Sequence, residues 1–248
     1  MATIAIGDIH GNLAALDDLL GRLPNDIDSR DTVVFLGDYI DRGPDAKGCL
    51  DRILRFRRET RAEVVCLRGN HEDWLLRTMD DYSRHSWLMG MESFDTIRSY
   101  STDAAIALQQ AVSAGGLTLF VNRVELPYDL FFAHMPPEHV DFLRGLAVRY
   151  RGPDGICVHG GLDPAVRRLE DQTVDALIWG ALGFPEDYVG DETVAYGHRD
   201  NAALDEDGWP HPRIVGATVG LDTIAHGVLT AMRLEDGRVF QSGRHKLT

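Results

Sequence analysis

Five short segments of this chain combine glycine with carboxylate, amide or imidazole side chains. Each lies at the end of an apolar run that is typical of a buried strand. The segments are Gly7–Gly11, Gly37–Gly43, Arg68–Glu72, His159–Gly161 and Gly197–His198. One such segment alone could be an ordinary surface turn, because Gly and Asp favour turns. Their repetition at strand ends instead indicates a site where oxygen and imidazole ligands hold divalent metal ions.

The segment Gly37–Gly43 carries two acids and a cation, Asp38, Asp41 and Arg42. The apolar run before it, Thr32–Leu36, predicts a strand that brings all three side chains to the carboxyl edge of a sheet. The sequence therefore predicts that this segment lies at the centre of a functional site.

The first half of the chain alternates expected strands with expected helices, at about 13–23, 46–58 and 73–76. This order predicts a largely parallel sheet with the ligand segments gathered at its carboxyl edge. From about residue 147 the pattern turns to strands and ends in a hairpin of 228–234 with 239–241, which predicts a second sheet packed on the first. We expect a single domain over 1–248, with a helical insertion at about 80–110 that forms either an auxiliary core cluster or a cap over the substrate.

In order and wording, the five segments resemble the phosphoprotein phosphatase branch of the calcineurin-like metallophosphoesterases, of the bacterial serine/threonine protein phosphatase type. The motifs GDxHG, GDxxDRG, GNHE, HGG and a later GH extend, with their flanking strands, from Ile4 to about Gln241. The resemblance implies an α/β fold in which two mixed β-sheets form a sandwich flanked by helices. It also implies hydrolysis of phosphate esters by direct attack of a hydroxide held between two metal ions.

The resemblance also implies a set of metal ligands, and the residue types agree with it. Two residues apart on extended backbone, Asp8 and His10 point to the same side and can share one ion. Oxygen and imidazole ligands without thiolate suit manganese, iron or zinc. We expect two divalent ions, with manganese favoured and iron, zinc or magnesium as alternatives. The implied ligands are Asp8, His10 and Asp38 for one ion and Asp38, Asn70, His159 and His198 for the other.

The last ligand position has two candidates in the sequence. His198 is favoured because it follows a strand and Gly197, as the family's later ligand does, whereas His226 lies in a different context. We expect His226 to line the substrate pocket or to bond a metal ligand.

The resemblance implies that His71 is the general acid, held and charged by Asp41, although Asp41 could instead only order its loop. A histidine suits this role because its pKa lies close to neutral pH and a neighbouring carboxylate raises it.

Arg42 offers a planar fork to phosphate oxygens. Relatives often carry a second arginine just past a tryptophan, but Gly180 follows Trp179 here. Arg199 is a candidate substitute, or else a solvated loop charge.

The formal net charge of −14, from 25 basic and 39 acidic residues, argues against a protein that binds duplex nucleic acid. An anionic substrate must therefore be attracted by a local positive centre. Two divalent ions, less the charges of Asp8, Asp38 and one hydroxide, leave about +1 at the site, and the neutral Asn70 preserves this balance.

Three cysteines without paired spacing favour a reducing compartment, and no secretory signal or apolar stretch of membrane-spanning length stands out. We expect a soluble cytoplasmic protein with no membrane partner. The expected substrate is a phosphorylated protein or peptide, carrying phosphoserine, phosphothreonine or phosphotyrosine, or a small phosphorylated molecule. The alternatives are a hydrolase of dinucleoside polyphosphates, similar to diadenosine tetraphosphatases, and a catalytically weak binding scaffold.

Overall fold

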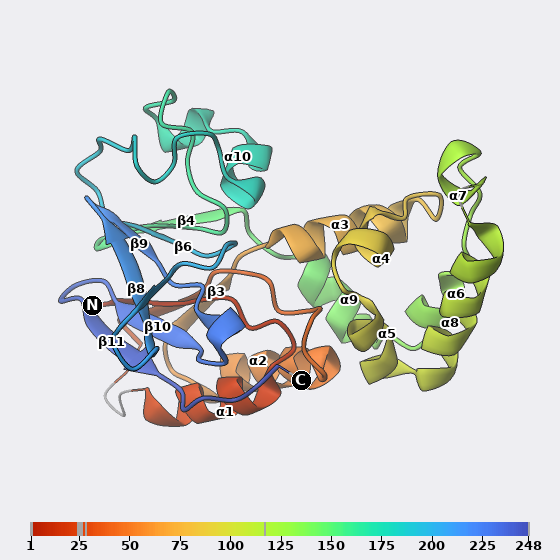
Figure 1. Cartoon of the computed structure of the whole chain (residues 1–248). Helices are drawn as coiled ribbons and strands as arrows, with labels where there is room; N and C mark the ends of the chain where they lie inside the picture. Colours follow the sequence, from red (N-terminus) through yellow and green to blue (C-terminus); the bar gives the residue numbers. More distant parts are fainter. Residues whose placement is uncertain (1, 24–26, 28, 117, 248) are drawn as a thin grey trace.

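The computed structural model describes residues 2–23, 27, 29–116 and 118–247, and its centre is a pair of mixed β-sheets (Figure 1). The first sheet has the order β11-β10-β1-β2-β3. Strands β1, β2 and β3 are parallel, while β10 runs antiparallel to both β1 and β11. Their bounds are β1 (Thr3–Ile6), β2 (Thr32–Phe35), β3 (Glu63–Cys66), β10 (Thr230–Arg233) and β11 (Arg238–Gln241).

The second sheet has the order β4-β5-β6-β9-β8-β7. Strands β5, β6 and β9 are parallel, and the two edges of the sheet are antiparallel. Its strands are β4 (Arg149–Gly152), β5 (Gly155–Val158), β6 (Val194–Tyr196), β7 (Ala202–Leu204), β8 (Pro210–Val215) and β9 (Thr218–Gly220). The predicted fold class, α/β with two mixed sheets flanked by helices, is confirmed.

The two sheets pack through small and branched side chains that alternate along their strands. Ala5 and Val34 of the first sheet share one buried cluster with Cys157, Ala195 and Val219 of the second. The neighbouring side chains in the first sheet, such as those of Ile4 and Val33, belong to another cluster with the helices, as the two-residue period of a strand requires. The sandwich fixes the strand ends of both sheets relative to one another.

Helices α1 (Leu13–Arg22) and α2 (Ala46–Glu59) belong to the cluster on the first sheet's outer face. Asn12 caps α1 by accepting a hydrogen bond from the Ala15 N–H group, and Asp45 caps α2 in the same way through Gly48. Helix α10 (Val174–Trp179) lies on the second sheet and packs through Leu177.

A helical segment follows β3 and extends away from the sheets in Figure 1. Its interior includes the fully buried side chains of Trp87, Ile97, Leu108 and Phe131. The helices continue well beyond the expected range of 80–110. They are α3 (Asn70–Asp80), α4 (Ser86–Gly90), α5 (Phe94–Tyr100), α6 (Thr102–Gly115), α7 (Thr118–Val121), α8 (Asp129–Phe132) and α9 (Pro137–Arg144).

Several expected boundaries differ from the observed ones. Helix α3 begins at Asn70 instead of about residue 73, because Gly69 is its N-cap and the ligand segment itself forms the first turn. The C-terminal hairpin is confirmed, with Ala231 paired to Phe240.

All three cysteines are buried free thiols. Among the described residues, the helices are too short or too polar to cross a bilayer.

Candidate metal centre

The ligand segments converge where strands of both sheets end. Asp38 follows β2, His10 follows β1, and His159 follows β5 of the other sheet. The Oδ2 atom of Asp38 lies 3.6 Å from Nε2 of His10, and its Oδ1 atom lies 3.4 Å from Nε2 of His159. One carboxylate therefore faces two separate imidazoles with its two oxygens.

Two groups of side chains in the described part of the chain could each hold a metal ion, and Asp38 belongs to both. In each group the ligand atoms lie within 4.8 Å of one another. By distance alone, the first group is Asp38 with His10 and His71, and the second is Asp38 with His159 and His198. The expected set has Asp8 in place of His71, whose Nδ1 atom bonds Asp41 instead. A shared carboxylate between two groups of donors is the arrangement that a dinuclear centre needs.

Asn70 belongs to the second group by distance. Its Oδ1 atom lies 2.9 Å from Nε2 of His159 and 2.8 Å from Nδ1 of His198. Its Nδ2 atom points away and lies 3.8 Å from Sδ of Met91. The amide thus presents its oxygen, the atom that binds metal ions, to the two histidines.

Asp8 lies in neither group, but it contacts the same region. Its Oδ2 atom accepts a hydrogen bond of 2.9 Å from the N–H group of His198, while Oδ1 is buried without a partner. Asp38 Oδ2 and His71 Nε2 are also buried without a partner. An unpaired buried polar atom costs about 1–3 kcal/mol, and cations beside these carboxylates would remove that cost. The donor set therefore fits divalent metal ions.

Backbone carbonyl groups orient two of the histidines. Nδ1 of His10 donates to the carbonyl of Ile40 over 3.1 Å, and Nδ1 of His159 donates to that of Leu36 over 3.0 Å. Each bond leaves Nε2 as the atom that faces the site. Burial holds the pKa of His10 well below its usual range, and burial lowers that of His198 to about 3. Both rings are thereby kept neutral, as metal ligands must be.

Glycine is needed at two of the strand ends because the ligands approach the backbone closely. A Cβ atom on Gly69 would lie 2.0 Å from Oδ1 of Asp38, and one on Gly197 would lie 2.0 Å from Oδ1 of Asp8. The backbone nearby is strained, because several non-glycine residues adopt left-handed conformations that packing must stabilise. These residues include His10, Asp38, Asp41, Arg42 and His198.

The expected general acid and its partner lie together. Nδ1 of His71 lies 2.8 Å from Oδ2 of Asp41, and both side chains are buried. Burial lowers the pKa of His71, but the charge of Asp38 and the hydrogen bond to Asp41 outweigh this effect and raise it to about 9. Both carboxylates therefore favour the protonated form of this imidazole.

The calcineurin-like phosphoesterase family matches residues 1–227. The chain belongs to this family. Its members are metal-dependent phosphoesterases, and the two groups of ligands around Asp38 agree with that chemistry.

The curated relatives of this calcineurin-like phosphoesterase include tetraphosphatases and protein phosphatases. The symmetrical bis(5'-nucleosyl)-tetraphosphatase of Pectobacterium carotovorum is 25% identical, and the match covers 97% of this chain and 94% of the relative. Serine/threonine-protein phosphatase 1 of Salmonella typhimurium is 38% identical, over 34% of this chain and 36% of the relative. The solved structure of a cold-active protein-tyrosine phosphatase from Shewanella shares the fold, with a TM-score of 0.55 at 17% identity. That match covers 98% of this chain and 80% of the solved one.

The remaining expected residues of this phosphoesterase lie at different depths. Arg42 is half-buried, and its Nη1 atom donates to Nε2 of His10 over 3.0 Å. Arg199 is exposed. His226 lies against Asp200, with Nε2 3.0 Å from Oδ2, and its partner is therefore an exposed carboxylate instead of a metal ligand.

Two buried acids near the metal ligands were given no role from the sequence. Glu72 accepts hydrogen bonds from the backbone N–H groups of Asp38, Tyr39 and Gly69 at 2.9–3.0 Å, so it joins two ligand segments. Asp222 is buried, and burial with the charge of Asp38 raises its pKa to about 7. The sequence did contain a pattern that could have indicated Asp222, because this residue follows β9 as the other acids follow their strands.

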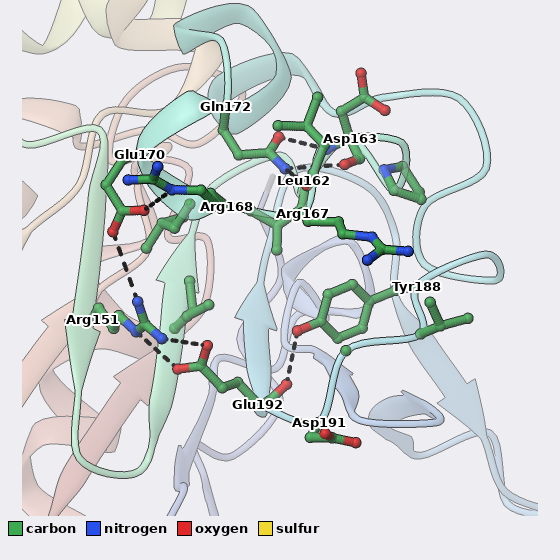
Figure 2. Close-up of a pocket in the computed structure, with 16 residues that line it drawn as sticks. Arg151, Leu162, Asp163, Arg167, Arg168, Glu170, Gln172, Tyr188, Asp191 and Glu192 are labelled. Carbon is green, nitrogen blue, oxygen red and sulfur yellow. Dashed lines mark hydrogen bonds and ion pairs between the residues drawn. The ribbon is translucent and has the colours of Figure 1, made fainter.

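A cavity of about 500 Å³ lies beside β5, between the segments 162–172 and 188–192 (Figure 2). Several of its charged side chains pair with one another, including Arg168 with Glu170 at 3.6 Å. Arg151 bonds Glu192 through Nε and Nη2 at 2.9 and 2.7 Å, and its Nη1 atom lies 3.8 Å from Glu170. None of the expected site residues lines this cavity.

Proposed function

We propose that this chain is a phosphoesterase that depends on two divalent metal ions, with manganese favoured. The observation that carries this proposal is the position of Asp38, whose two oxygens face His10 and His159. When bound, the ions would activate water for in-line attack and neutralise charge on the phosphate. The residues proposed to hold them are Asp8, His10, Asp38, Asn70, His159 and His198.

The side chains around the ions have separate proposed roles. His71 donates a proton from Nε2 to the leaving oxygen, and Asp41 holds its ring from the Nδ1 side. Arg42 binds phosphate oxygens through its guanidinium fork once the substrate is present.

Metal content tests the first part of the proposal. After manganese loading and gel filtration, elemental analysis should give about two ions per chain, as a dinuclear centre requires. Less than one ion per chain would contradict the proposal and favour the binding scaffold.

We further propose a dinucleoside polyphosphate as the substrate. The motifs favour a phosphorylated protein as the substrate, but we rank the dinucleotide first because the Pectobacterium carotovorum tetraphosphatase matches 97% of this chain. An aromatic pair beside the candidate metal site supports the proposal. Trp179 lies with its ring centre 4.7 Å from that of Trp74 and 6.2 Å from that of His198, and both tryptophans are half-buried. Such a surface suits a nucleobase, which stacks on aromatic rings.

A phosphorylated protein is the second candidate. Its support is the sequence of the motifs Gly37–Gly43 and Gly69–Glu72, together with the Salmonella protein phosphatase that matches about a third of the chain. The absence of an arginine after Trp179 removes one expected phosphate ligand and weakens this candidate.

One experiment separates the two candidates. The manganese-loaded protein is assayed on diadenosine tetraphosphate, a phosphothreonine peptide and a small aryl phosphate, with Trp179→Ala and Trp209→Ala variants. Trp209 is the control because it lies on the β7–β8 hairpin and bonds Gln241. Loss of base stacking should raise the KM of Trp179→Ala for the dinucleotide about fivefold or more, with little change on the aryl phosphate. Preference for the peptide, with an unchanged KM for the dinucleotide, would favour a protein phosphatase.

A further inference from the structure

We propose that Trp87 and Thr96, two residues of the helical segment, are positioning residues for the proton donor. They hold Asp41 in place, and Asp41 in turn fixes the ring of His71. This inference rests on the proposed function, in which His71 protonates the leaving group. It gives helices α4 and α5, which carry Trp87 and Thr96, a part in the chemistry as well as in the core.

Asp41 receives hydrogen bonds from the helical segment on both of its carboxylate oxygens. Trp87 Nε1 donates to Oδ2 over 2.9 Å, and Thr96 Oγ1 donates to Oδ1 over 2.7 Å. The same Thr96 hydroxyl accepts a hydrogen bond of 2.7 Å from the backbone N–H group of Asp41. All three side chains are almost fully buried, so water does not compete for these bonds.

The bonds constrain the direction of the imidazole. Oδ2 of Asp41 lies between two donors, Nδ1 of His71 and Nε1 of Trp87. The indole is itself fixed, because it stacks on Phe131 with ring centres 5.5 Å apart and an angle of 24° between the planes. With Nδ1 held in this way, Nε2 of His71 lies 3.8 Å from Oδ2 of Asp38, beside the candidate metal site.

The backbone of the same segment also needs support. Asp41 and Arg42 adopt left-handed conformations, with φ of 70° and 66°, which are costly for residues other than glycine. The helical segment contacts this strained turn through Thr96 and through the carbonyl of Glu92, which accepts from the Arg42 N–H group over 3.3 Å. The helical segment therefore holds the turn that carries both Asp41, the partner of His71, and the phosphate-binding Arg42.

The leaving-group dependence of the rate distinguishes positioning from simple core packing. A poor leaving group such as phenolate needs a proton as its bond to phosphorus breaks, whereas 2,4-dinitrophenolate departs as a stable anion. Misplacing the acid should therefore slow phenyl phosphate and spare 2,4-dinitrophenyl phosphate. A general loss of structure would slow both substrates alike.

The test uses the manganese-loaded full chain with Trp87→Phe and Thr96→Val, which keep the shape and remove the donors. Each should lose about tenfold or more in kcat on phenyl phosphate and less than about twofold on 2,4-dinitrophenyl phosphate. Thr96→Ser, which restores the hydroxyl, should recover most of the loss. The matched control is Tyr128→Phe, which removes a buried hydroxyl 3.1 Å from His85 in the same segment without touching Asp41.

His71→Asn is the reference variant that separates the proton-donor role of His71 from the positioning role of Trp87 and Thr96. If it slows both substrates equally, the proton-donor role fails, and this inference fails with it. If it slows phenyl phosphate selectively while Trp87→Phe and Thr96→Val slow both substrates equally or neither, the proposed function stands and the positioning role is overturned. Selective slowing in all three variants, with Tyr128→Phe unaffected, supports the inference.

Discussion

The imidazole of His71 and the carboxylate of Asp41 share a hydrogen bond of 2.8 Å at a place that solvent does not reach. Burial alone would lower the pKa of His71, but the charge of Asp38 and the bond to Asp41 raise it to about 9. Cations bound beside Asp38 would offset the first of these two contributions, so that the bond to Asp41 becomes the main one.

The pH profile of the enzyme should report this bond. His71 must carry its proton to act, so kcat on a poor leaving group should fall as pH rises through its pKa. Asp41→Asn removes a contribution that raises this pKa, and the falling limb should therefore move to lower pH. The measurement is kcat on phenyl phosphate between about pH 5 and pH 10 in manganese-loaded protein, a range that includes histidine's ordinary pKa of about 6.5. An unmoved limb would show that another group controls it.

Asp38→Asn should remove metal together with activity. The substitution halves the number of strong oxygen ligands that face His10 and His159, and it affects both groups at once. Elemental analysis after manganese loading should fall from about two ions per chain to less than one. Asp73→Asn is the control, because Asp73 is also buried but pairs with Arg77 over 2.8 Å outside both metal-ligand groups. Two ions per chain in Asp38→Asn would rule out a bridging role.

The sequence predicts much of the fold and most residues of the candidate site because both depend on local patterns. A strand followed by glycine and a ligand is visible in the sequence, and the close approaches at Gly69 and Gly197 explain why glycine is required there. Trp87 and Thr96 could not be assigned to the site in this way. They contact Asp41 from 46 and 55 residues away, and only the three-dimensional packing of the helical segment brings them there.

Boundaries and partners set by tertiary contacts were also beyond the sequence. The first turn of α3 carries Asn70 and His71, a position that the apolar pattern beginning at Trp74 does not reveal. The pairing of His226 with Asp200 joins two segments that are 26 residues apart in the sequence. Neither the start of α3 nor the pair of His226 with Asp200 follows a recurring spacing that a single sequence could show.

Glu72→Gln should destabilise the whole chain. The carboxylate accepts hydrogen bonds from the N–H groups of Asp38 and Gly69, so it connects the segments after β2 and β3. In the Glu72→Gln variant, the side-chain NH₂ group would face backbone N–H groups, which are also donors. Hydrogen bonds to a charged group contribute about 1.5–3 kcal/mol each, and the free energy of unfolding in urea should fall by about 2 kcal/mol or more.

The control for this loss is a glutamate at the surface. Glu138 pairs with Arg58 over 2.7 Å, but both side chains are about 60% exposed. Glu138→Gln should therefore change the free energy of unfolding by about 0.5 kcal/mol or less. Equal effects of the two substitutions would show that Glu72 does not hold the ligand segments together.

Arg42 and Arg199 should differ in their effect on a small phosphomonoester. Arg42 is half-buried against His10, whereas Arg199 lies exposed beside His198, where solvent screens its charge. Arg42→Ala should lower kcat/KM about 10- to 100-fold, the loss expected for charge-assisted hydrogen bonds to phosphate, while Arg199→Ala stays within about twofold. Arg42→Lys should recover only part of the loss, because a single ammonium cannot reproduce the guanidinium fork. An equal loss in Arg199→Ala would instead make Arg199 a second phosphate ligand, filling the role of the arginine that is absent after Trp179.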